Sequence, residues 1–461
     1  MSVFSSPFNE PFHNPFGSPF NGPGIGGGGA WSPLQYFAAS EQGIWLDPSD
    51  MSTLFQDSAG TTPVTAVEQP VGKILDKSGR GNHATQATAG SRPKLSARKN
   101  WLLASEDFSA ATWTKNAVTV VANSATASDG NVTADKLVPP ATNAVHQVYA
   151  SASGVTVAAG QRWTGSVDLK ADGCGFCYVE VHGGTGKGFC VNLTTGAITN
   201  ASAGLIAGTV ENLGNGWWRA NVTEDTAAAY VYLQLYPRAT AGDIAAWLGD
   251  GINGVLMSRA QLEAGPTATT YQRVTTATDY DTVGFLHYLK FDGVDDSLST
   301  GSIDFTATDK MTVVAGLTKL SEAAAGIACA VGVNINTTPG VDLAAGPNTN
   351  KSVAYGSRGT TLAYPVYTNA SISVPKTMVL TGQSDISADI CTLRVDGSQV
   401  VSSASDQGSG SYGSAAIYIG RRGGTSLPFN GNLYQLVVRG AATADLTPGE
   451  TFAAGKTGVT L

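Results

Sequence analysis

Two things that the sequence lacks exclude whole classes of protein. No stretch approaches 18 consecutive apolar residues, so nothing predicts a membrane-spanning helix. Charged residues make up only 13% of the 461 residues, and the formal net charge is −8. Proteins that bind nucleic acid neutralise its phosphates with surplus Lys and Arg. We therefore expect neither a nucleic-acid partner nor insertion into a membrane.

Cysteine is also scarce, and its distribution does not suit a disulfide framework. Five is an odd number, and Cys174 and Cys177 form a lone CxxC without the second pair or nearby histidines that a zinc site needs. We interpret all five as buried thiols of a protein assembled in a reducing compartment, with a metal site or disulfide as the alternative. They are Cys174, Cys177, Cys190, Cys329 and Cys391.

The motifs of common hydrolases are missing too. There is no GxSxG elbow and no HExxH helix. Glycoside hydrolysis requires two carboxyl groups at a set separation, yet "VDLKADG" and "YVEVHGG" each supply one acid at a suitable strand position. The segment 183–188, "GGTGKG", lacks the full P-loop spacing and indicates a hairpin turn. The sequence therefore predicts a protein that is not an enzyme.

What the sequence does contain is typical of β-structure. Helical periodicity is scarce, and glycine is abundant at 56 residues. Short runs of alternating apolar and polar residues, such as "RWTGSVDLKA" and "YVYLQLYPR", are bounded by Gly, Asn, Asp or Pro. This pattern predicts an all-β sandwich.

The segment before Trp31 has a different character. Four Pro-Phe pairs recur every four residues and place Phe8, Phe12, Phe16 and Phe20 on one side of an extended chain. A glycine run follows and is typical of a flexible tether. We interpret the segment as a docking arm whose rings fill pockets on a partner, with a low-complexity tail as the alternative.

Several motifs resemble a concanavalin A-like sandwich of the laminin-G type. They are "GIWLDPSDMSTLFQDS" and "VGKILDKSGRGNHATQ" within 43–86, "YLKFDGVDDSLST" at 288–300, and "YIGRRGGTSLPFNGNLYQLVVRG" at 418–440. The motifs occur in the family's order but are separated by some two hundred residues. The resemblance therefore implies a host sandwich that carries an insertion. Its glycosidase members carry a Glu-x-Asp-x-x-Glu strand, which this sequence lacks.

The inserted piece has a resemblance of its own. "LGNGWWRANVT", "GDGINGVLMSRAQLEAG" and "ATTYQRV" resemble a jelly-roll module similar to carbohydrate-binding modules of phage tail and virion proteins. Together with the repetitive N-terminus, the chain resembles a bacteriophage fibre or decoration protein. This resemblance implies a virion location after assembly in the bacterial cytoplasm, and other virion proteins as partners of the arm. Such fibres are commonly trimers, so it also implies a homo-oligomer.

These observations predict four segments. Residues 1–40 form the extended arm and tether, 41–96 begin the concanavalin A-like domain, 97–280 form the inserted jelly roll, and 281–461 complete the host domain. The expected fold class is all-β, with one sandwich inserted in the other.

Alternation along three strands of the insert predicts a binding face. Apolar residues point to one side, and tyrosines, acids, an amide and an imidazole point to the other. If these strands share a sheet, that face suits a sugar, whose C–H groups pack on rings and whose hydroxyls pair with planar polar groups. A subunit contact and a bare solvated surface are the alternatives. The candidate residues are Asp168, Tyr178, Glu180, His182, Tyr230, Tyr232, Gln234 and Tyr236.

Three acids in "FDGVDD" form a second candidate site. Asp292, Asp295 and Asp296 offer the hard oxygen ligands that calcium prefers. An acidic β-turn without a metal is the alternative.

The leading functional prediction is a non-enzymatic virion protein. It docks through its arm and displays sandwich domains that bind host-surface polysaccharide. The first alternative is a purely structural decoration protein of the capsid or tail, and a weaker one is a polysaccharide hydrolase.

Overall fold

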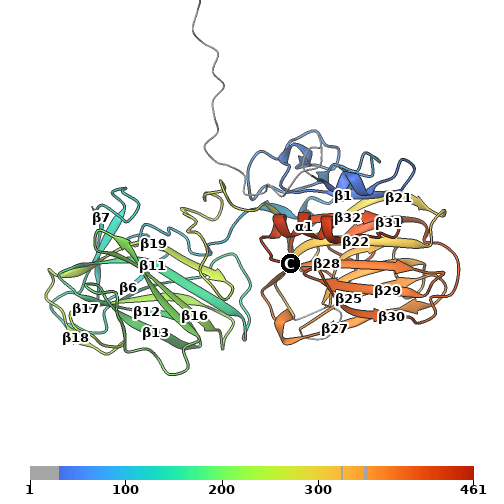
Figure 1. The fold of residues 1–461 in the computed structure, drawn as a ribbon. Helices are drawn as coiled ribbons and strands as arrows, with labels where there is room; N and C mark the ends of the chain where they lie inside the picture. Colours follow the sequence, from blue (N-terminus) through green and yellow to red (C-terminus); the bar gives the residue numbers. More distant parts are fainter. Residues whose placement is uncertain (1–30, 323–324, 347–350) are drawn as a thin grey trace, which may run out of the picture.

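The computed structural model describes residues 31–322, 325–346 and 351–461. In these ranges every pairing between named strands is antiparallel, and the only α-helix is α1, Thr447–Thr457. Figure 1 shows two β-rich bodies side by side. The candidate docking residues Phe8, Phe12, Phe16 and Phe20 lie outside the described ranges.

The host sandwich consists of two large sheets. Sheet A has the order β30-β29-β28-β22-β32-β20-β5, with β1 also paired to β32. Its strands are β1 (Gly43–Leu46), β5 (Lys94–Ser96), β20 (Tyr288–Asp292), β22 (Lys310–Lys319), β28 (Lys376–Asp385), β29 (Ile390–Val395), β30 (Ser398–Ser403) and β32 (Asn430–Arg439).

Sheet B faces sheet A and has the order β2-β3-β4-β21-β31-β23-β24-β25-β26, with β27 paired to β25. Its strands are β2 (Leu54–Phe55), β3 (Lys73–Ile74), β4 (Ala84–Thr85), β21 (Leu298–Phe305), β23 (Gly326–Val331), β24 (Gly340–Gly346), β25 (Ser352–Arg358), β26 (Leu362–Ala363), β27 (Val366–Thr368) and β31 (Gly413–Ile419). Short 3-10 helices occur at Pro33–Tyr36, Met51–Thr53, Ala89–Ser91 and Ala370–Ile372.

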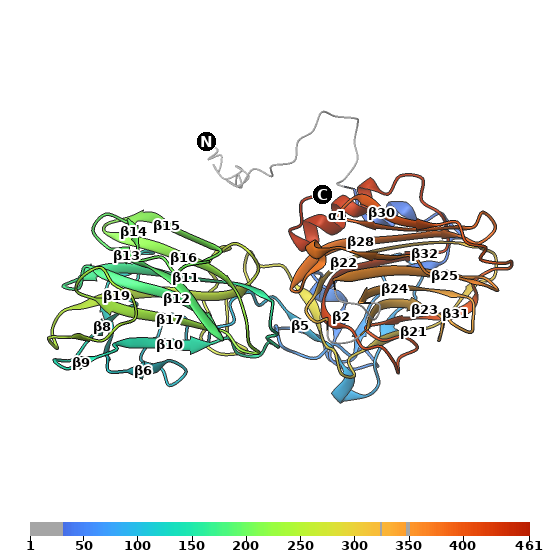
Figure 2. The same cartoon turned by 90° about the horizontal axis from the view of Figure 1, so that it is seen from below.

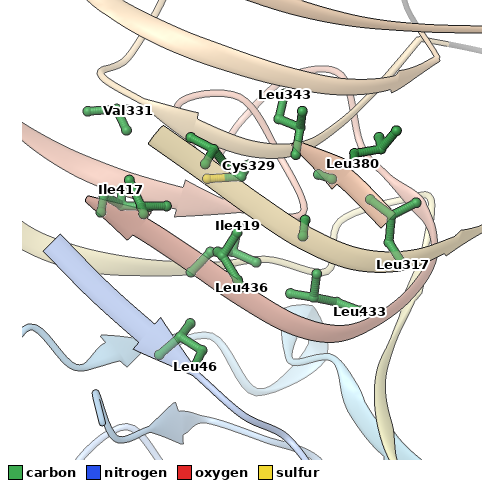
Figure 3. Close-up of a cluster of buried hydrophobic side chains, with 14 of the residues drawn as sticks. Leu46, Leu317, Cys329, Val331, Leu343, Leu380, Ile417, Ile419, Leu433 and Leu436 are labelled. Carbon is green, nitrogen blue, oxygen red and sulfur yellow. The ribbon is translucent and has the colours of Figure 1, made fainter. Parts of the chain in front are cut away.

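The host core forms between these two sheets because alternate residues of each strand point inward. Figure 3 shows Leu436 of β32 and Leu317 of β22 among side chains of sheet B such as Ile419 and Cys329. Leu46 of β1 belongs to the same cluster although it lies nearly four hundred residues before Leu436 in the chain. On the other face of sheet A, α1 packs against Val314 and neighbouring residues.

The inserted sandwich has two six-stranded sheets and lies beside the host sandwich in Figure 2. Sheet C has the order β14-β13-β12-β17-β10-β6, and sheet D has the order β15-β16-β11-β19-β8-β7. Sheet C contains β6 (Thr114–Asn116), β10 (Gln147–Ser151), β12 (Phe176–Gly183), β13 (Thr185–Asn192), β14 (Ile198–Thr199) and β17 (Tyr232–Arg238). Sheet D contains β7 (Thr119–Ala125), β8 (Ala134–Val138), β11 (Arg162–Asp172), β15 (Ala207–Gly214), β16 (Trp217–Asp225) and β19 (Gly254–Ala264); β9 (Asn143–Ala144) and β18 (Trp247–Leu248) pair separately.

The way the chain enters and leaves the insert explains how the host tolerates it. β5 pairs with β20, and Ser96 stands opposite Tyr288, so the two ends of the intervening chain are neighbours in sheet A. An insertion between adjacent points leaves the host pairing intact. The expected all-β class, with one sandwich inserted in another, is confirmed by this pairing, while the boundaries at 40, 96 and 280 stay a prediction.

Two further expectations can be compared with the described residues. All five cysteines are free and buried, as expected for structural thiols, and burial raises the pKa of each; for Cys174 it reaches about 11. No helix in the described ranges is long and apolar enough to cross a membrane.

Candidate functional site

The polar face predicted from alternation runs along β12 and β17, which are neighbours in sheet C. Their register places three pairs side by side: Tyr178 with Tyr236, Glu180 with Gln234, and His182 with Tyr232. The intervening residues, such as Val179 and Leu235, are fully buried in the core of the insert. The period of two along each strand therefore separates core from polar face as expected.

One end of this face is closed. The exposed fraction of both Tyr178 and Tyr236 is only 4%. The Tyr178 hydroxyl lies 2.7 Å from the Ser202 hydroxyl, and the Ser202 N–H donates to the carbonyl of Gly188 in β13 at 2.9 Å. The loop that carries Ser202 is thereby bonded to the sheet at this end. The expectation that Tyr178 and Tyr236 contact a glycan is wrong, because both rings are covered and both hydroxyls are already hydrogen-bonded within the protein.

The middle of the face is a buried hydrogen-bonded layer. The Tyr236 hydroxyl donates to Gln234 Oε1 at 2.7 Å, and Glu180 Oε1 lies 2.8 Å from His182 Nδ1. Glu180 and Gln234 are 4% and 8% exposed, so they support the surface more than they form it. Burial, followed by the charge of Glu180, raises the pKa of Tyr236 far above its usual value. The phenol therefore remains a donor at any physiological pH.

The other end of the face is open and aromatic. Tyr230 is 41% exposed, and the side chain of His182 is 31% exposed. The His182 and Tyr230 rings are nearly parallel with centroids 6.3 Å apart, and the Tyr230 and Tyr232 centroids are 5.2 Å apart. Tyr149 of β10 meets Tyr232 edge-on at 5.6 Å. We call His182, Tyr230, Tyr232 and Tyr149 the ring cluster.

Tyr149 is a member that the sequence analysis missed. β10 reads QVYAS, in which Val148 and Ala150 are buried and Tyr149 is half-buried on the other side. The same alternation that identified β17 was available here. It was weaker because the strand is only five residues long.

Glycines in β13 leave room for the polar layer. Gly186 stands opposite His182, and Gly188 stands opposite Glu180. A Cβ at Gly186 would lie 1.6 Å from Glu180 Oε1 and 2.7 Å from His182 Nδ1. The "GGTGKG" segment is thus part of a hairpin, in agreement with the hairpin interpretation. Its glycines have no side chains and leave room for the Glu180 carboxylate.

Asp168 does not belong to this face. Its strand, β11, lies in sheet D, so only β12 and β17 meet the condition of sharing one sheet, and the assignment of Asp168 to the face is wrong. Asp168 is fully buried and pairs with Arg219 at 2.7 Å and Arg259 at 3.4 Å. The chain crosses from one sheet to the other between β11 and β12, and alternation within a strand carries no signal for such a crossing.

The three acids of the host turn do lie together. Ligand atoms of Asp292, Asp295 and Asp296 are all within 4.8 Å of one another. Burial, and then the charge of Asp292, raises the pKa of Asp296 to about 7. Each carboxylate also has a protein partner: Asp292 Oδ1 accepts the Val294 N–H at 2.8 Å, Asp296 Oδ2 accepts the Asp292 N–H at 3.1 Å, and Ser91 donates to Asp295 at 2.8 Å. This donor set suits calcium, and calcium binding stays a prediction.

Comparison with known proteins yields structural likenesses only. No protein-family model and no curated protein matches the chain. Similar solved structures include the CBM40 of the Ruminococcus gnavus IT-sialidase bound to α2,6 sialyllactose (17% identity, 32% of this chain and 84% of that chain, TM-score 0.26). Others are domains LG4-5 of the mouse laminin α1 chain (12%, 62% and 84%, 0.28) and the receptor binding domain of botulinum neurotoxin D (11%, 42% and 50%, 0.29). With TM-scores this low, the fold assignment rests on the sheet pairing described above.

Proposed function

We propose that this chain is a non-enzymatic glycan-binding protein whose ring cluster contacts the sugar. The observation that carries the proposal is the open end of sheet C, where four rings from three segments meet on one surface. Exposed aromatic clusters are costly in water and mark binding surfaces. The hydroxyls of its tyrosines and the His182 imidazole supply polar contacts at the rim of the rings.

The chemistry of the surface suits a saccharide better than a purely apolar ligand. Tyrosine rings pack against the C–H faces of a pyranose, and their hydroxyls donate and accept. The His182 imidazole, held by Glu180, places a further polar edge beside Tyr230. A ligand that is apolar on one side and hydroxylated at its rim satisfies both parts of the cluster.

The same proposal extends to where the protein acts. We propose a phage virion protein that docks through residues 1–30 and displays the ring cluster toward host polysaccharide. The support is the family resemblance and the spacing of Phe8, Phe12, Phe16 and Phe20. A homo-oligomer, with a trimer as the first expectation, belongs to the same proposal.

A glycan array tests the binding proposal. Wild type is expected to bind a subset of glycans, and Tyr230→Ala and Tyr232→Ala are expected to lose that binding with unchanged folding by circular dichroism. Tyr367→Ala, at a half-buried tyrosine of β27 in the host sandwich, is the matched control and should bind like wild type. Equal binding by all three variants would rule out the ring cluster as the site.

Particle assembly tests the location. A variant lacking residues 1–30 should be absent from particles while its sandwiches bind glycan as before. Full occupancy of this variant on particles would refute the docking arm and leave the glycan proposal untouched.

A structural decoration role is the second candidate, because an exposed ring cluster also suits a subunit contact. In that case Tyr232→Ala would lower the oligomer mass measured by light scattering and change no glycan binding. Release of reducing sugar from host polysaccharide by wild type would instead favour the weaker hydrolase alternative.

A further inference from the structure

A cleft of about 770 Å³ lies between the two sandwiches, away from the ring cluster. The insert contributes Trp101, Glu263 and Pro266 to its walls, and the host contributes Lys376, Asn432 and Tyr434. Direct hydrogen bonds join the bodies: Gln161 Nε2 donates to the Leu320 carbonyl at 3.2 Å, and Lys290 Nζ donates to the Gly154 carbonyl at 2.9 Å. Clefts of this size between domains are common ligand sites. We call it the inter-sandwich cleft.

The charged groups that line the cleft are mainly cationic. Five cations face two carboxylates, Asp225 and Glu263. Asp225 is engaged by Arg162 through two bonds of 2.8 Å, and Glu263 accepts the Thr269 N–H at 2.8 Å. Of the other cations, only Lys376 has an acid within ion-pair distance, Asp396 at 3.6 Å. In the described part of the chain, Arg98, Lys99 and Lys351 have none.

Two cations lie over one tryptophan beside the cleft. Arg98 is 5% exposed, its Nε donates to the Asn100 carbonyl at 2.8 Å, and its guanidinium lies 5.0 Å from the centre of Trp101. Lys290 lies over the same indole at 5.1 Å. Burial lowers the pKa of both cations, and Glu68 opposes this in each case. That carboxylate is already engaged by Ser96 and Tyr280.

Two polar atoms of the cleft lining have no partner. Arg98 Nη2 is a buried donor without an acceptor, and Asn432 Oδ1 is a buried acceptor without a donor. Asn432 is 6% exposed. Leaving a buried polar group unsatisfied is unfavourable, and two such groups of opposite kind among the residues that line one cleft indicate a ligand that carries both an anionic acceptor and a hydroxyl donor.

The rest of the lining is rich in hydroxyl groups. Threonines and serines from both sandwiches surround the cleft, as hydroxylated ligands require. They include Thr267, Thr269, Thr318, Ser371, Ser373 and Thr377.

We propose that the inter-sandwich cleft binds an acidic saccharide, with the sugar's carboxylate on Arg98 and a hydroxyl on Asn432. Lys99, half-exposed and next to Arg98 in the chain, strengthens the field that attracts the acid. The site is separate from the ring cluster, so ligand binding in the cleft does not depend on whether the ring cluster binds a glycan.

The test measures binding of matched trisaccharides by isothermal titration calorimetry. The probes are acidic trisaccharides that contain galacturonate, glucuronate or a sialic acid, and their neutral counterparts. Wild type is expected to bind at least one acidic probe at least tenfold more tightly than its neutral counterpart. The affinity should fall with added NaCl, because exposed charges are screened.

Two variants place the binding in the cleft. Lys99→Glu reverses a half-exposed charge, and Asn432→Asp replaces the unpartnered acceptor with an anion of the same shape. Each variant should bind the acidic probe at least tenfold more weakly than wild type does. Lys73→Glu, with the same charge change on β3 of the host, should bind like wild type. The proposal is overturned if no acidic probe binds, if neutral probes bind equally, or if both cleft variants bind like wild type.

Discussion

The two sandwiches hold their polar clusters in opposite ways. The insert builds its cluster on a sheet face, where residues from β10, β12 and β17 meet only because the strands are paired in register. The host builds its acidic cluster in one turn, from residues that are neighbours in the chain. In the first cluster the polar groups are hydrogen-bonded to one another, whereas in the second three carboxylates of like charge lie close together. Loops can therefore close one end of a sheet face and leave the other open, whereas the turn runs from an exposed Asp292 to a buried Asp296.

The buried end of the insert's face should give the largest effect on stability. Tyr236→Ala removes a buried ring and the donor to Gln234, and large-to-small changes of aromatic core residues cost about 3–5 kcal/mol. Urea denaturation of Tyr236→Ala and Tyr232→Ala measures the contrast. A smaller loss for Tyr236→Ala than for Tyr232→Ala would contradict the described burial.

The acidic turn should respond to pH in the opposite sense to a paired carboxylate. Asp296 has a pKa raised to about 7, so between pH 4 and 7 the folded state holds a proton that the unfolded state has released. The stability that this proton contributes is present below pH 4 and is lost as pH rises through about 7.

Asp296→Asn should abolish that pH dependence. At about 1.4 kcal/mol per pKa unit, the variant should be more stable than wild type by up to about 4 kcal/mol at pH 8. Thermal unfolding at pH 5 and pH 8 makes the comparison. Parallel profiles for the two proteins would show that Asp296 titrates normally.

Calcium would relieve the same repulsion. If the turn binds calcium, about 10 mM exceeds the dissociation constants of weak extracellular-type sites, and it should raise the Tm of wild type at pH 8 but not that of Asp296→Asn. A chelator that leaves the wild-type Tm unchanged in the presence of calcium would count against the metal.

The glycine beside the polar layer should give an intermediate effect. Gly186→Ala places a methyl group against Glu180 and His182, and overpacking costs about 1–3 kcal/mol. Gly175→Ala, where a Cβ meets nothing within 4 Å, is the matched control. Equal stability of the two variants would show that the Glu180 side chain moves aside without cost.

The open end should give the smallest effect on stability and a clear one on binding. Tyr230→Phe keeps the ring and removes one hydroxyl, so we expect glycan affinity to fall about threefold to tenfold, up to the 1.4 kcal/mol worth of one hydrogen bond. Surface plasmon resonance measures it. Unchanged affinity would assign Tyr230 a stacking role only.

The sequence predicted much of the face and missed its surroundings. Alternation placed Tyr178, Glu180 and His182 opposite the core side of β12, and sheet C has them there. It grouped Asp168 with them, which is wrong because β11 belongs to sheet D. It also treated Tyr236 as accessible, since no local pattern reveals which loop covers a strand.

Which side chains share one side of a strand was determined by the sequence alone, because successive residues of an extended chain must point to opposite faces. The proximity of the three acids in the host turn was also local. Tertiary structure alone decided which strands became neighbours, which end of the polar face remained open, and that Arg98 and Asn432 line one cleft. Those outcomes depend on contacts between residues far apart in the chain, for which a local pattern contains no information.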